Sequence, residues 1–207
     1  LGVEFCAVLQ CLESRTIISS AVLGGAAGLT GSLLYSPDGL RPGQTAAINS
    51  GTIMGAWTMF SMSLAFEFAE TSTELTTLLM LGQVAGTLSG GFAYEYFQPT
   101  AGEVALVNSA TIWSSVLTGL SLGIGGINRT TTTWTSLFLV SHLSAATMAY
   151  FAKDLAMSRG RVLLIDGSAI LGGLVGAAAV LVTAGDSVSG EAVQVGSALG
   201  ITAGLAL

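Results

Sequence analysis

Long uncharged segments, separated by short polar or charged connections, are the main pattern along this chain. They cover 16–37, 42–66, 75–94, 104–128, 130–152 and 167–185, and 192–207 is uncharged as well. Runs such as Leu163-Leu164-Ile165 lack the alternation of polar and apolar residues that is typical of membrane barrel strands. The pattern therefore predicts helices near 16–35, 43–66, 75–97, 103–127, 133–153, 161–183 and 191–207.

The length of these segments indicates a membrane protein. A helix needs about 20 mostly apolar residues to cross a hydrocarbon layer about 30 Å thick, and six segments have roughly this length. Only 9% of the residues are charged, against about 25% in soluble domains, which is too few to cover a globule. A large soluble helical array is the alternative, but it needs charged outer faces that none of the predicted helices has. We expect an all-α, polytopic membrane bundle.

A motif of glycine, a polar residue, an apolar run, Asn or Asp, and small residues occurs three times. Its copies are Gly43–Gly51, Gly102–Ala110 and Gly160–Ser168, and the spacing between successive copies is almost constant. Each copy follows a turn and opens the second helix of a helical hairpin. The constant spacing predicts a repeat of about 58 residues.

Small residues at every fourth position run along both helices of the predicted hairpins. Such ladders let helix backbones approach closely in lipid. The glycines expected to pack helices together are Gly24, Gly28, Gly51, Gly55, Gly82, Gly86, Gly90, Gly172, Gly176, Gly196 and Gly200.

The repeat predicts a single membrane-embedded region over 1–207. Its parts are the end of a preceding hairpin at 1–13, hairpins at 16–68, 74–127 and 132–184, and the first helix of a fourth hairpin at 188–207. Since this register begins and ends inside helices, we expect the chain to be a fragment of a longer polypeptide.

The recurring glycine motif resembles that of uncharacterised glycine-rich helical-hairpin repeat proteins of bacterial envelopes. The resemblance covers most of the chain by repetition. It implies an integral membrane protein of a bacterium and no known activity.

Asp166 is the one acidic residue well inside a predicted spanning helix, at 161–183, and ionisable residues inside membranes are functional candidates. Its equivalents in the other repeats are Asn49 and Asn108. Because a neutral amide serves there, the favoured role is a structural hydrogen bond to a neighbouring hairpin turn, with Arg159 or Arg161 compensating the charge. A polar pathway for ions or protons is the alternative.

Other chemistry finds little support in the sequence. His142 has no second ligand at metal-binding spacing, so we expect a hydrogen-bonded contact between helices, no metal and no cofactor. With one histidine in the chain, no Ser-His-acid assembly is available, and we expect no enzyme. Trp134 fits a membrane interface, whereas Trp57 and Trp113 are expected to pack or face lipid. A net charge of −6 gives no basic patch for nucleic acid.

Two functions follow from these features. The first is a structural or assembly protein whose partners are the lipid bilayer and other membrane subunits or copies of itself. The second is a channel or transporter with a polar path near Asn49, Asn108 and Asp166. If the membrane is a bacterial inner membrane, four basic residues on the side of the turns within hairpins, against two on the other, place the former side in the cytoplasm.

Overall fold

The computed structural model describes residues 39–127, 129–184 and 188–206, and within them the chain is entirely helical. The helices are α3 (Pro42–Phe66), α4 (Ser72–Phe97), α5 (Ala101–Ile124), α6 (Thr130–Leu155), α7 (Arg159–Ala184) and α8 (Gly190–Leu205). The all-α class predicted from the sequence is confirmed for these residues. The helix expected at 16–35, with Gly24 and Gly28, lies outside them.

Four of the helices are long and apolar enough to cross a membrane. They are α4 from Thr73 to Phe97, α5, α6 and α7, and α7 is the most apolar of the four. Among the described helices, α8 has only 16 residues, and α3 is diluted by polar residues such as Gln44 and Asn49. The sequence analysis expected a span at α3 too, and α3 is not among these four helices.

The helix ends follow local capping rules. Pro42 occupies the first turn of α3, where its missing N–H is not needed. At α4, Thr71 Oγ1 accepts a hydrogen bond from Glu74 N, while Glu74 Oε2 accepts one from Thr71 N, which makes a capping box. Ser189 caps α8 by accepting from Ala192 N at 3.1 Å. These residues fix where α3, α4 and α8 begin.

Three helices end on residues other than glycine in the left-handed region. Glu67, Gln98 and Ala156 have φ values of 56°, 46° and 44° and follow α3, α4 and α6. In that region the Cβ of a residue other than glycine lies too close to the following carbonyl oxygen, which destabilises the conformation.

We expect Ala156→Gly to stabilise the protein by about 1 kcal/mol, because glycine relieves this conformational cost at the end of α6. Thermal unfolding in detergent measures it. Ala146→Gly is the matched control, since Ala146 is exposed in the interior of α6 and glycine there should cost up to about 1 kcal/mol. A loss of stability in both variants would contradict the capping argument.

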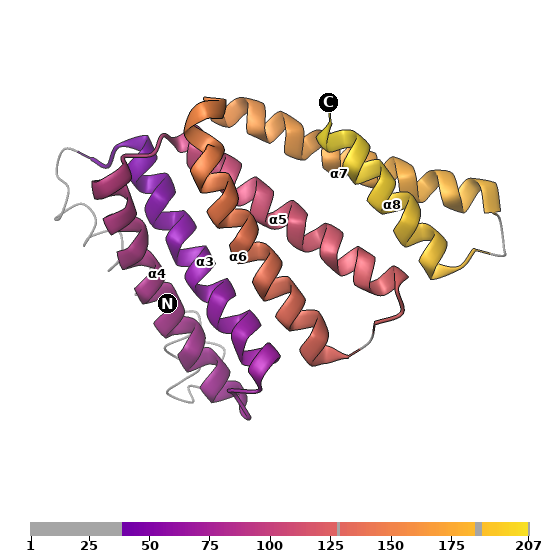
Figure 1. Cartoon of the computed structure of the whole chain (residues 1–207), viewed down its shortest axis with the longest axis horizontal. Coiled ribbons are helices and arrows are strands. Elements are labelled where there is room, and N and C mark those ends of the chain that lie inside the picture. Colours follow the sequence, from indigo (N-terminus) through magenta and orange to yellow (C-terminus); the bar gives the residue numbers. More distant parts are fainter. Residues whose placement is uncertain (1–38, 128, 185–187, 207) are drawn as a thin grey trace, which may run out of the picture. The chain divides into compact units, whose positions relative to one another are not determined.

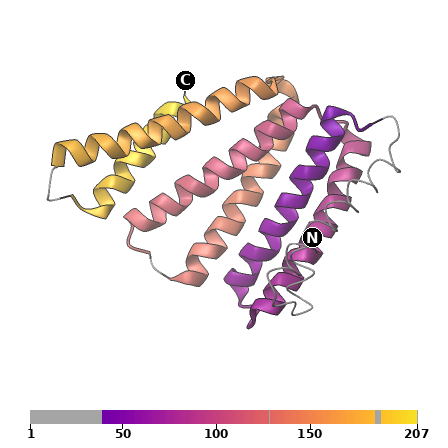
Figure 2. The same cartoon turned by 180° about the vertical axis from the view of Figure 1, so that it is seen from behind.

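The described residues fall into two compact units, which divide between Ala101 and Gly102. In the first, α3 and α4 lie side by side and antiparallel, and in the second α7 and α8 do the same (Figures 1 and 2). These pairs join the second helix of one predicted hairpin to the first helix of the next. Hairpin 2, predicted at 74–127, is divided between the two units.

Many hydroxyl side chains bond within their own helix. Thr58, Thr77, Thr111 and Thr202, for example, donate to the carbonyl four residues earlier at 2.7–2.8 Å. On α7, Ser168 does the same at 2.9 Å. The hydroxyl donors of these Ser and Thr residues are therefore satisfied by the backbone of their own helix.

Candidate functional site: two glycine seams and a carboxylate

Five glycines bring α3 and α4 into backbone contact, and we call this set the first seam. Its members are Gly51, Gly55, Gly82, Gly86 and Gly90. A Cβ added to Gly55 would overlap the carbonyl oxygen of Gly82, and one added to Gly82 would overlap that of Gly55. Gly51 and Gly86 oppose each other in the same reciprocal way. No residue larger than glycine fits these positions without separating the helices.

A second seam joins α7 to α8 by the same geometry. Its members are Gly172, Gly176, Gly196, Gly200 and Gly204. Gly172 opposes Gly200, and Gly176 opposes Gly196, each with an added Cβ close to the partner's carbonyl carbon or oxygen. Close glycine contacts of this kind allow extensive van der Waals packing and weak Cα–H···O interactions between helices. Apart from Gly24 and Gly28, which lie outside the described residues, every glycine expected from the sequence to pack helices lies in one of these two seams.

Hydroxyl groups add hydrogen bonds between helices beside the small residues. Thr52 Oγ1 of α3 lies 2.7 Å from Thr87 Oγ1 of α4, next to the opposed Gly51 and Gly86. Between α5 and α6, Ser144 Oγ donates to the carbonyl of Ala110 at 3.0 Å. The sequence analysis did not identify these pairs, because spacing alone does not reveal which hydroxyls face a partner helix.

The faces of α4 and α7 opposite the glycines are apolar and exposed. On α4, Val84 and Leu88 are 48% and 58% exposed, and on α7, Ile170 and Leu174 are 55% and 63% exposed. Large apolar side chains thus lie outside and glycines inside, the reverse of a water-soluble helix pair. This arrangement suits a lipid environment.

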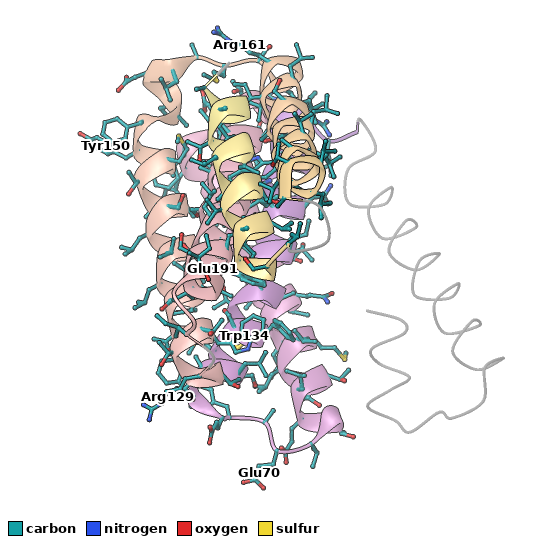
Figure 3. The ribbon with its side chains drawn as sticks, turned by 90° about the vertical axis from the view of Figure 1, so that its right-hand side faces the viewer. Glu70, Arg129, Trp134, Tyr150, Arg161 and Glu191 are labelled. Carbon is teal, nitrogen blue, oxygen red and sulfur yellow. The ribbon has the colours of Figure 1, made fainter. Side chains whose placement is uncertain are left out.

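Aromatic and charged groups lie near the ends of the second unit's helices. Figure 3 shows Arg129 and Trp134 near the start of α6, Tyr150 towards its other end, and Arg161 beyond the turn into α7. Trp and Tyr favour the boundary between membrane and water, where an amphipathic ring meets both media. The position of Trp134 agrees with the interfacial role expected from the sequence.

Asp166 accepts two hydrogen bonds on one carboxylate oxygen. Ser109 Oγ and Trp113 Nε1, both on α5, donate to Asp166 Oδ1, the latter at 2.8 Å. The carboxylate is half-buried. We call these three residues the Asp166 contact. It links Asp166, near the start of α7, to two side chains in the middle of α5.

Two expectations about this contact are wrong. Asp166 was expected to bond a neighbouring turn with Arg159 or Arg161 as the compensating charge, whereas its partners in the described part of the chain are Ser109 and Trp113. Trp113 was expected to pack or face lipid, and instead its ring N–H donates to the carboxylate. The sequence places Trp113 four residues after Ser109, so both donors lie on one face of α5, but this spacing does not show that the face contacts Asp166.

The other polar candidates have simpler surroundings. Asn49 is exposed on α3, and Asn108 is half-buried on α5. His142 Nδ1 lies 2.7 Å from the carbonyl of Phe138, and its ring packs on the Phe138 ring with centroids 4.4 Å apart. Both contacts lie within α6, so they do not provide the expected link between helices.

The opening glycines of the repeat motif have a role that the sequence analysis missed. A Cβ on Gly43 would overlap the carbonyl oxygen of Pro99, in the connection that follows α4. A Cβ on Gly102 would overlap the carbonyl oxygen of Met157, in the connection that follows α6. In these two of the three copies, the motif glycine leaves room for the turn that comes almost one repeat later.

Comparisons with protein-family models, with curated proteins and with solved structures give no match.

Proposed function

We propose that this chain is a non-enzymatic structural or assembly protein of a bacterial membrane, built from a repeated glycine-rich hairpin. Small residues hold helices together within each unit, and the protein packs against other membrane subunits or copies of itself. The bilayer is the surrounding medium.

The observation that carries this proposal is the reciprocal contact of glycines in the two seams. Between helices already in lipid, apolar burial contributes little, so close packing and interhelical hydrogen bonds must supply the stability. Both seams have backbone-to-backbone contact over several helical turns. A body of this kind resists separation of its helices, which favours a scaffold over a moving carrier.

A channel or transporter is the second candidate, and the Asp166 contact is what favours it. A carboxylate within a candidate membrane helix is costly and often marks an ion or proton path. However, the two donors on Oδ1 also explain its position as a link between α5 and α7. The neutral Asn at the equivalent positions 49 and 108 fits this structural role better than it fits a path.

Integration into a membrane is tested by cysteine labelling of the connections. In a Cys6→Ser, Cys11→Ser background, we place single cysteines at Thr100 and Ser158 and, separately, at Glu70 and Thr131. Because α4 to α7 each cross once, an impermeant maleimide should label the first two sites from one side and the last two only from the other. Detergent-solubilised protein, in which all four sites must react, is the control. Labelling of all four sites from one side of sealed vesicles would contradict the proposal.

A further inference from the structure

The connection between α6 and α7 carries half of the basic residues of this chain. Lys153 lies in the last turn of α6, and Arg159 and Arg161 lie in the first turn of α7. They are three of the six Lys and Arg residues in a chain whose net charge is −6. We call these three residues the basic turn.

The side chains of the basic turn are exposed and have no charged partner. Lys153, Arg159 and Arg161 are all exposed. Two acids lie near them, Asp154 on α6 and Glu103 in the first turn of α5. None of the three cations forms an ion pair with these acids or with another carboxylate in the part of the chain that the structure describes. Their charges are therefore free to bind an anion from outside the chain.

Each cation lies about one helical turn from an exposed apolar or aromatic side chain on the same helix face. Tyr150 lies three residues before the lysine, Leu163 four residues after the first arginine, and Leu164 three residues after the second. These side chains are 78%, 60% and 73% exposed. In every pair the cation is nearer the helix end and the apolar or aromatic residue nearer the middle of the span. Figure 3 shows Tyr150 and Arg161 at the same end of the second unit.

This order of charge and apolar surface matches an anionic phospholipid. The phosphate of a lipid lies at the boundary of the hydrocarbon layer, which Lys and Arg side chains near helix ends reach. A guanidinium group donates paired hydrogen bonds to a phosphate, and the acyl chains continue along the apolar surface below it. A free phosphate ion would use the cations but not the side chains beside them. The surface therefore fits a lipid better than a soluble anion.

The charges at the other described connections do not form such a surface. Between α3 and α4 the charged residues are acidic, with Glu67 and Glu70 in the connection and Glu74 in the first turn of α4. Arg129 is the one cation between α5 and α6. An anionic headgroup is repelled at the first connection and attracted by a single charge at the second.

We propose that the basic turn binds the headgroup of an anionic phospholipid, whose acyl chains lie against Tyr150 of α6 and the exposed leucines at the start of α7. This inference adds a lipid-binding site to the proposed function. It rests on that function only for the membrane location of α6 and α7.

Displacement of a quenching lipid tests the site. In the Cys6→Ser, Cys11→Ser background, Tyr150→Cys is labelled with a small fluorophore, and the protein is placed in vesicles of phosphatidylcholine that carry a nitroxide on the acyl chain. Unlabelled phosphatidylglycerol should relieve the quenching at a lower fraction than unlabelled phosphatidylcholine does. Equal relief by the two lipids would overturn the proposal. Inorganic phosphate, added at constant ionic strength, should leave this preference unchanged; if it abolished the preference, the site would bind free phosphate and not lipid.

Two double variants of the labelled protein separate a local site from a general effect of charge. Arg159→Gln with Arg161→Gln should lower the preference for phosphatidylglycerol roughly 25-fold, about 5-fold for each arginine. Arg41→Gln with Arg129→Gln is the matched control, since it removes the same two charges from other exposed positions and should leave the preference unchanged. Thermal unfolding in detergent verifies that both variants fold.

Two results from these variants would contradict the site. One is an equal loss of preference in both, which would indicate net charge alone. The other is an unchanged preference in the folded variant of the basic turn. Either result would leave the labelling pattern expected of the four spans unaffected, so failure of this inference is distinguishable from failure of the proposed function.

Discussion

Gly86→Ile should separate α3 from α4 and destabilise the protein by about 1–3 kcal/mol, at the upper end of this range for overpacked sites. An added Cβ at Gly86 overlaps the carbonyl oxygen of Gly51 and also lies against the carbonyl carbon of Gly51 and the Cα of Gly55. These atoms belong to backbone, so no rotamer change can make room. The helices must move apart, and the many weak contacts along the first seam weaken together. Thermal stability in detergent measures the loss.

Gly91→Ile is the control for this change, five residues further along α4. No atom lies within 4 Å of a Cβ at that position, so the side chain points into free space. Isoleucine is a better helix former than glycine, and the variant should be as stable as the original protein or more stable. If Gly86→Ile were equally harmless, the seam would not hold the helices together, and the main support for a structural role would be lost.

Asp166→Leu should also destabilise the protein, by about 1–3 kcal/mol, because it leaves two hydrogen-bond donors without their acceptor. Trp113 Nε1 and Ser109 Oγ both donate to Asp166 Oδ1, and an unsatisfied half-buried donor costs the desolvation of that group. Asp166→Asn keeps a carbonyl oxygen in the same place and should be nearly neutral. Unfolding of the three proteins in the same detergent gives the comparison.

The same pair of variants separates the two candidate functions. A structural protein reconstituted in liposomes should give proton and potassium flux no higher than that of empty liposomes, with either Asp or Asn at position 166. A pathway through Asp166 requires a group that can bind a proton or carry charge, so Asn would stop the flux in a folded protein. Flux that is present with Asp166 and absent in the folded Asp166→Asn variant would overturn the structural proposal.

The positions of the helices could be predicted because polar residues mark their ends. The expected helices at 43–66 and 161–183 match α3 and α7, Pro42–Phe66 and Arg159–Ala184, closely at both ends. The expected end of α5 at residue 127 was too late. Gly126, with φ of 66°, follows the last turn and ends the helix, and a glycine pair at 125–126 is a signal that the charge pattern did not use.

The pairing of helices could not be predicted from the repeat alone. Repeats fix a period but not where the packed unit begins, and small-residue ladders occur on both helices of each predicted hairpin. Only the structure shows that Gly55 faces Gly82 across the connection between two predicted hairpins. The partners of Asp166 were hidden for a related reason. Ser109 and Asp166 are 57 residues apart, and no local pattern reports a contact at that distance.

The hydroxyl groups that bond to their own helix bear on how the protein is made. A serine or threonine whose hydroxyl donates to the carbonyl four residues earlier carries this donor into lipid already satisfied, before any partner helix arrives. Hydropathy scales count such residues as polar. They therefore understate the tendency of α4, α5 and α7 to partition from a translocon into the bilayer. Each of these helices can enter the bilayer singly during synthesis. We expect the glycine contacts to form after insertion, when the helices meet in the plane of the membrane.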